Sequence, residues 1–176
     1  MVFLNFYDIV SETCQFDEQF AKRIGFKKIF VINKDVRAVG NNTKSDDDLD
    51  RCIAFGMDKN QLLSLVKRGA PAVSITDFYI DRKLMEAIKE NKAILLIPMS
   101  AITSLYGIER SRTIYKVGKL YTHARKMGID VCFASMAKDP LHMNSAIQLL
   151  ELAKLIGAEE KYARHSMSEI TKAVVE

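Results

Sequence analysis

The sequence has few of the residues on which most catalytic and cofactor sites depend. It contains only three histidines and none of the HxH, HxxxH or HExxH patterns that commonly bind catalytic metals. GxGxxG, GxxxxGK[ST] and GxSxG motifs are also absent, which argues against classical dinucleotide, P-loop and α/β-hydrolase sites. We therefore expect no metal ion and no cofactor.

Cysteine and long apolar runs are also scarce. Cys14, Cys52 and Cys132 lie far apart and form no CxxC pair, which argues against a zinc site and against a disulfide scaffold. The apolar start, MVFLNFYDIV, is short and lacks the basic first residues and the small-residue cleavage site of a signal peptide. No apolar run approaches membrane-spanning length. We expect a cytoplasmic protein with no membrane partner.

The composition that remains is that of an ordinary globular chain. Of its 176 residues, 48% are hydrophobic and 27% are charged, and the apolar residues are spread along the whole length. This composition predicts one domain, residues 1–176, with a hydrophobic core. The net charge is only +4, so a nucleic-acid partner is indicated only if the basic residues cluster.

Short apolar runs alternate with amphipathic segments, which predicts an α/β fold built on a parallel sheet. The expected strands are residues 2–6, 28–33, 52–56, 72–76, 93–98 and 129–135. The expected helices are 17–24, 58–68, 81–91, 108–127, 141–156 and 166–175, and 41–50 is expected to be a polar loop. An eight-unit barrel typically needs about 250 residues. The pattern alone therefore leaves an open sheet and a barrel with fewer strands as equal alternatives.

The predicted helix at 108–127 carries the most uneven charge in the chain. It contains six Lys or Arg residues and one acid, Glu109. At about 100° per residue, one arc of the helix is basic, and the opposite arc is apolar and should face the sheet. The basic arc comprises Arg112, Lys116, Lys119, His123 and Lys126, and the apolar arc comprises Ile114, Val117, Tyr121 and Ala124. The basic arc is a candidate surface for a phosphate backbone, although such arcs are usually only solvated helix faces.

Three further residues are candidates at the carboxyl ends of the strands, where ligands bind in parallel α/β folds. Arg110 lies on the apolar side of its helix but in the first turn. It therefore either reaches over the strand ends or pairs with a carboxylate such as Asp77 or Asp139. Ser100 and Ser135 follow two predicted strands, so they could hold a phosphate or simply cap the next helices.

Residues 84–176 resemble the RNase P protein component 3 family of archaea, which is related to the thirty-kilodalton subunit of eukaryotic RNase P. The matching features are an apolar strand, an E-R-S start to a long basic helix, a strand that ends in S-x-A, and an L-x-x-L helix followed by Gly. In this sequence they are Ala93–Pro98, Glu109–Ser111, the helix through Lys119 and Lys126, Ile129–Ala137, and Leu149–Leu152 with Gly157. The sequence departs from the family at Ser100, where an Arg is common, and at Asn144 and Ala146, where R-x-P is common.

The resemblance implies a TIM-like parallel strand–helix barrel related to phosphoesterases of the PHP type, with their metal ligands lost. It also implies a subunit that is not catalytic alone but belongs to an RNA-based endoribonuclease, ribonuclease P, which removes the 5′ leader from precursor tRNA. The implied partners are RNase P RNA, precursor tRNA and a second small protein subunit. We expect Arg110, Arg112, Lys116, Lys119 and Lys126 to contact RNA. The alternative is a phosphoesterase, either of the PHP type or another small phosphate-binding barrel.

Overall fold

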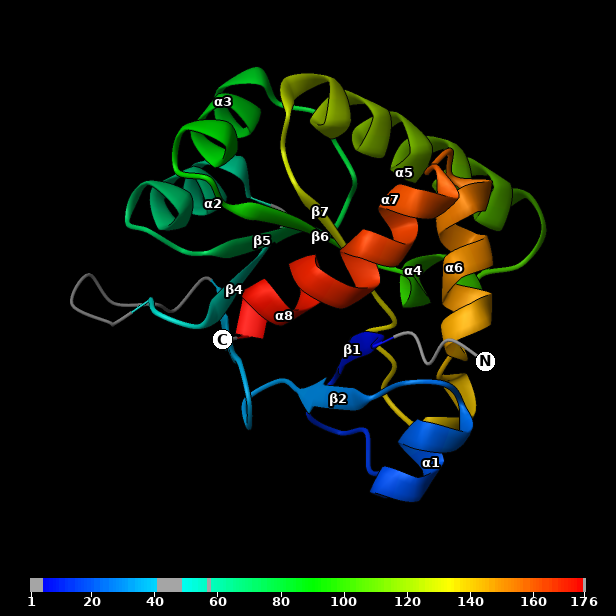
Figure 1. Ribbon diagram of the computed structural model, residues 1–176. Helices are drawn as coiled ribbons and strands as arrows, with labels where there is room; N and C mark the ends of the chain where they lie inside the picture. Colours follow the sequence, from blue (N-terminus) through cyan, green and yellow to red (C-terminus); the bar gives the residue numbers. More distant parts are fainter. Residues whose placement is uncertain (1–4, 41–48, 57, 176) are drawn as a thin grey trace.

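The computed structural model describes residues 5–40, 49–56 and 58–175. The predicted loop at 41–50 falls mostly outside these residues, as do positions 2–4 of the first predicted strand. Seven short strands occur along the described chain, and from the fourth strand onward each strand is followed by one or more helices (Figure 1). The strands are β1 (Tyr7–Val10), β2 (Lys28–Val31), β3 (Arg37–Val39), β4 (Cys52–Gly56), β5 (Ala72–Ile75), β6 (Ile94–Pro98) and β7 (Val131–Ala134).

The strands form two parallel sheets. The larger sheet has the order β3-β4-β5-β6-β7, and the smaller one pairs β1 with β2. Pro98 at the end of β6 lies beside Ala134 at the end of β7, so these two predicted strands are neighbours. The parallel α/β class predicted from the sequence is confirmed.

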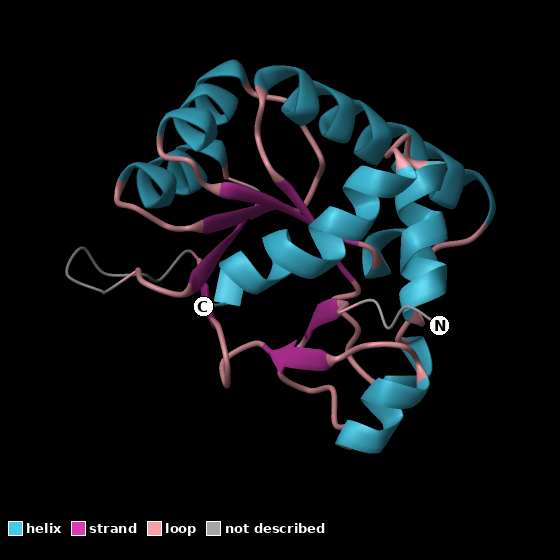
Figure 2. Ribbon diagram, viewed as in Figure 1, coloured by secondary structure: helices cyan, strands magenta, loops and turns pink. Residues whose placement is uncertain are grey.

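Helices cover both faces of the larger sheet (Figure 2). One face packs against α2 (Lys59–Lys67), α3 (Arg82–Glu90), α5 (Gly107–Met127) and α6 (Ala146–Leu155). The other face packs against Ile170, Val174 and Val175 of the C-terminal segment, which consists of α7 (Glu160–His165), the π-helical turn η2 (Ser166–Ile170) and α8 (Thr171–Val175). Two short elements, α1 (Glu18–Arg23) and α4 (Ser100–Thr103), follow β1 and β6. Burial on both sides explains why β6 and β7 are almost entirely apolar.

A few contacts connect the two sheets. The backbone N–H of Met136 donates to Ile9 O at 2.9 Å, and the N–H of Ser11 donates to Ala137 O at 3.0 Å. These bonds place β1 beside the end of β7. At the other side, a single bridge joins Ile32 to Val36 between β2 and β3. No closed barrel forms within the described residues.

The C-terminal segment covers the edge of β7 that faces away from β6. Tyr162 Oη accepts from the N–H of Val131 at 2.7 Å, and Ser166 Oγ accepts from the N–H of Phe133 at 3.1 Å. Ser166 Oγ also donates to Val131 O at 2.7 Å. Side chains thus occupy the first half of an edge that another strand would pair with in a closed barrel.

Three predicted boundaries are corrected by the structure. The first strand is β1 at Tyr7–Val10 and not 2–6, where residues 5 and 6 are not in a strand. The helix predicted at 141–156 begins at Ala146, because Ser145 and Gln148 form a capping box; a separate turn, η1 (Pro140–His142), precedes it. The last helical segment begins at Glu160 and not Ser166, since α7 continues into η2 and α8.

Candidate nucleic-acid interface

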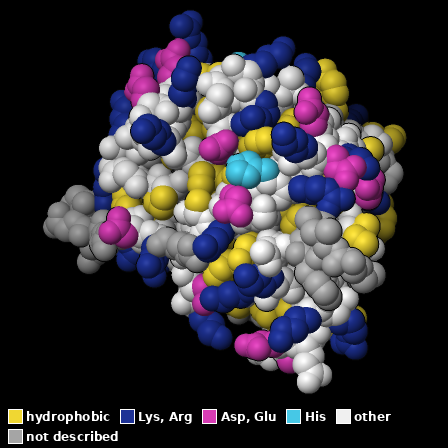
Figure 3. Space-filling model, viewed as in Figure 1, with side chains coloured by type: hydrophobic (Ala, Val, Ile, Leu, Met, Phe, Trp, Pro, Cys, Tyr) yellow, Lys and Arg dark blue, Asp and Glu magenta, His cyan; other side chains and the backbone are white. Residues whose placement is uncertain are grey.

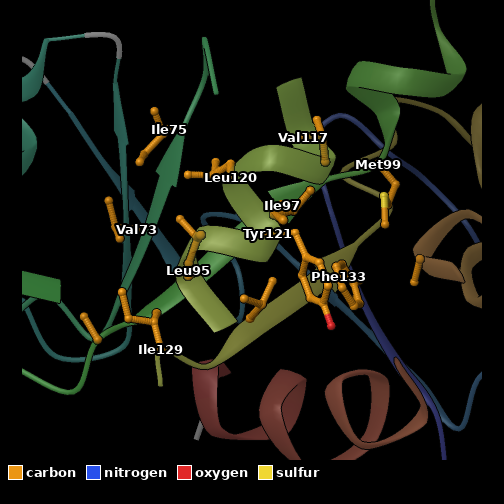
Figure 4. Close-up of a cluster of buried hydrophobic side chains, with 14 of the residues drawn as sticks. Val73, Ile75, Leu95, Ile97, Met99, Val117, Leu120, Tyr121, Ile129 and Phe133 are labelled. Carbon is orange, nitrogen blue, oxygen red and sulfur yellow. The ribbon is translucent and has the colours of Figure 1, made fainter. Parts of the chain in front are cut away.

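Helix α5 holds the predicted basic residues in a fixed orientation because its inner face is buried. Val117, Leu120, Tyr121 and Ala124 are buried, and in Figure 4 the labelled α5 side chains point into the same cluster as Leu95, Ile97 and Phe133. The ring centroids of Tyr121 and Phe133 are 5.6 Å apart. The helix ends at Gly128, whose φ of 77° suits glycine at a C-cap. Ile114, which was also predicted to face the sheet, is partly buried.

The opposite face of α5 is exposed and basic. Arg112, Lys116, Lys119 and Lys126 are exposed, and His123 is partly exposed. Arg112 is paired with Glu109, the single acid of the helix, at 3.0 Å. Within the described part of the chain, Lys116 and Lys126 are not in ion pairs, and Lys119 lies 4.7 Å over the ring of Tyr115. Exposed ion pairs such as that between Arg112 and Glu109 contribute little free energy, so Arg112 can exchange its carboxylate partner for a phosphate. This face can therefore still attract phosphates.

Arg110 lies in the first turn of α5 and is partly buried. Among the described residues it forms no ion pair with Asp77 or Asp139, the two carboxylates considered from the sequence. Asp139 instead pairs with His142 at 2.6 Å, and the hydrogen bond from His142 lowers the pKa of Asp139. A role for Arg110 at the strand ends therefore stays a prediction.

The structure brings Ser100 and Ser135 together at the ends of β6 and β7. The N–H of Ser100 donates to Ser135 O at 2.9 Å, but Ser135 is fully buried. Its N–H donates to Asp8 Oδ1 at 2.7 Å, and the N–H of Ile9 donates to the same oxygen at 2.8 Å. Asp8 in its ionised form would repel a phosphate bound at this position.

Asp8 is the residue of this region that the sequence did not single out. It is fully buried in β1, and its Oδ2 has no hydrogen-bond partner among the described residues. Burial raises the pKa of Asp8 to about 6, although hydrogen bonds from Ser135 and Ile9 oppose the rise. The only signal in the sequence is one acid in an otherwise apolar strand, YDIV.

The described residues contain no group of three or more His, Cys, Asp or Glu side chains that could hold a metal ion. None of their helices is long and apolar enough to cross a membrane. Cys14, Cys52 and Cys132 are buried free thiols, and burial raises the pKa of Cys132 to about 12.

A second basic region surrounds β2. A cleft of about 940 Å³ is lined there by lysines from α1, β2 and the following turn, but also by acids. The lysines include Lys22, Lys27, Lys28 and Lys34, and the acids are Glu12, Glu18 and Asp35. Figure 3 shows basic side chains over the face seen in Figure 1, with acidic ones interspersed. The mixed lining distinguishes this cleft from the α5 face.

No protein-family model matches the chain, and no curated protein sequence matches it significantly. Solved structures do resemble it in fold. A chain in the cryo-EM structure of archaeal ribonuclease P with mature tRNA has a TM-score of 0.70 at 15% identity, covering 96% of this chain and 80% of that one. Aspergillus niger ochratoxinase has a TM-score of 0.55 at 18% identity, and a Xaa-Pro dipeptidase has 0.54 at 14%.

The extent of these matches differs. This chain spans only 30% of the ochratoxinase chain and 33% of the dipeptidase chain, and each match covers 70% of this chain. The likeness to the archaeal ribonuclease P chain extends over almost all of this chain. At such identities the likeness establishes a shared fold.

Proposed function

We propose that this chain is a protein subunit related to those of ribonuclease P, which binds RNase P RNA and supports removal of the 5′ leader from precursor tRNA. The observation that carries the proposal is the likeness in fold to a chain of archaeal ribonuclease P over 96% of this chain. The basic face of α5 adds independent support, because it is the kind of surface that binds a phosphate backbone.

In this proposal, Arg112, Lys116, Lys119 and Lys126 bind phosphates along the exposed face of α5, and Arg110 acts at the strand ends. A guanidinium can contact a phosphate with two parallel hydrogen bonds, so Arg110 would fix geometry as well as supply charge. The buried inner face of α5 anchors the helix from which these side chains project. The protein itself performs no chemistry, and it needs no cofactor.

The chain is one domain, an incomplete TIM-like barrel related to PHP-type enzymes, in which the C-terminal segment takes the place of further strands beside β7. It acts in the cytoplasm with precursor tRNA and a second small protein subunit. The contacts between Ile9 and Met136 and between Ile32 and Val36 support the barrel description, because they join the two sheets at both sides.

The test is a titration of the purified protein into labelled RNase P RNA from the same cell. A structured RNA of equal length that is unrelated to RNase P serves as the control. We expect tighter binding to RNase P RNA, and faster 5′-leader removal when the protein is added to that RNA with its partner subunit. Equal binding to both RNAs, with no effect on leader removal, would contradict the proposal.

A further inference from the structure

The exposed side of α5 borders a groove of about 580 Å³. Its lining combines basic, aromatic and aliphatic side chains and contains no carboxylate. Lys119, Lys126 and Tyr115 come from α5, whereas Leu155 and Ile156 come from the end of α6. A groove that combines cations with apolar side chains fits a ligand that carries both an anionic group and a planar aromatic ring.

Tyr115 stands in this groove with its ring open to solvent. Its exposed fraction is 62%, which is high for an aromatic residue, and Leu155 across the groove is 58% exposed. Lys119 Nζ lies 4.7 Å from the centre of the Tyr115 ring. The ammonium group therefore lies over one face of the ring, and a base that stacks on the other face would have a cation close to its phosphate.

The groove lies where α5 passes close to the end of α6. A Cβ atom at Gly118 would lie 3.2 Å from Ile156 O, so a larger residue would require the end of α6 to shift by a few tenths of an ångström. Gly118 lines the groove together with Tyr115 and Lys119 of the same helix.

We propose that this groove binds an unpaired nucleotide of RNA, whose base stacks on Tyr115 while its phosphates contact Lys119 and Lys126. The inference rests on the proposed function, since it assumes that α5 faces RNA. A duplex keeps its bases stacked on one another, so only a single-stranded, looped or bulged nucleotide can offer a base face to Tyr115. The charge of α5, with six basic residues against one acid, favours RNA over a protein partner.

The experiment measures binding of the full chain to a single-stranded RNA and to a duplex RNA of the same length and phosphate number. The single strand carries 2-aminopurine, whose fluorescence falls when it stacks. Tyr115→Ala is compared with Tyr115→Phe, which keeps the ring, and with Tyr106→Ala. Tyr106 is 83% exposed at the start of α5 but lies outside the groove lining, so it is the matched control. Thermal unfolding of each variant checks that the fold is unchanged.

We expect the wild type to prefer the single strand and to quench the fluorescence. Tyr115→Ala should lose about five- to tenfold in affinity for the single strand and lose the quenching, with little change for the duplex. Tyr115→Phe and Tyr106→Ala should behave as the wild type.

Equal binding of both RNAs, unaltered by Tyr115→Ala, would overturn the inference while leaving RNA binding by α5 intact. Failure of the wild type to bind any RNA would instead overturn the proposed function. If Tyr115→Ala leaves RNA binding unchanged but dissociates the protein from a second copy or another subunit, the groove is a protein interface and the inference is wrong.

Discussion

Replacement of Asp8 by asparagine should stabilise the protein at neutral pH and should change how its stability depends on pH. The carboxyl group is fully buried, and burial raises its pKa from 3.8 to about 6. The folded state therefore holds the Asp8 proton more tightly than the unfolded state does. The contribution of Asp8 to stability is fully present below pH 4 and is lost as the pH rises to about 6.

The magnitude follows from the size of the shift. Each pKa unit corresponds to about 1.4 kcal/mol, so ionisation of Asp8 costs the folded state about 2 to 3 kcal/mol at pH 7. Asparagine keeps the oxygen that accepts from Ile9 and Ser135, and it cannot ionise. Its new N–H₂ group takes the place of Oδ2, which has no hydrogen-bond partner among the described residues. This unpartnered donor should reduce the stabilisation of the variant by about 1 kcal/mol.

The assay is urea unfolding of the wild type and of Asp8→Asn at intervals between pH 4 and pH 7. Other carboxylates, such as Asp139 and Glu160, have lowered pKa values and give the opposite slope, but they are the same in both proteins. The difference in unfolding free energy between variant and wild type therefore isolates Asp8. We expect this difference to rise by about 2 kcal/mol in favour of the variant. A difference that is constant with pH would refute the reasoning.

Four further predictions concern α5, the edge of β7 and catalysis. Lys116→Ala and Lys119→Ala should each weaken RNA binding and reduce the slope of log K against log salt by about one unit, whereas Lys83→Ala on α3 should not. Arg110→Ala should weaken binding more than either lysine variant, measured in the same titration, because a guanidinium also fixes geometry. Ser166→Ala should lower the unfolding free energy by about 1 to 3 kcal/mol, measured in urea, because the hydroxyl satisfies two backbone groups of β7. The pure protein should not hydrolyse a generic phosphodiester, and hydrolysis that chelation abolishes would contradict its assignment as non-catalytic.

Those parts of the fold that depend on local pattern were predictable from the sequence. The apolar runs at 93–98 and 129–135 contain β6 and β7, and the basic and apolar arcs of 108–127 separate as expected on α5. Helices α2 and α3 begin directly after Asp58 and Asp81, whose side chains accept from later N–H groups of the first turn. Such signals work because capping and periodicity involve residues only a few positions apart.

The parts that depend on distant residues were not predictable. Strand β3 is only three residues long, and it exists because Arg37–Val39 pair with β4. The burial of Asp8 depends on Ser135, which lies 127 positions away in the sequence. The groove at Tyr115 requires the end of α6 to pass close to Gly118. No local pattern encodes these contacts, so the unpartnered carboxyl oxygen and the groove became visible only in three dimensions.

The most direct test of the central claim is recovery of RNA with the tagged protein from its native cell, followed by sequencing. The wild type is compared with a variant in which Lys116, Lys119 and Lys126 are all alanine, and with a control in which exposed lysines Lys83, Lys89 and Lys161, outside α5, are replaced instead. We predict that RNase P RNA is enriched with the wild type and the control and is lost with the α5 variant. If RNase P RNA is absent from the wild-type sample, or is retained in full by the α5 variant, the account of this protein as an RNase P subunit that binds RNA through α5 is contradicted.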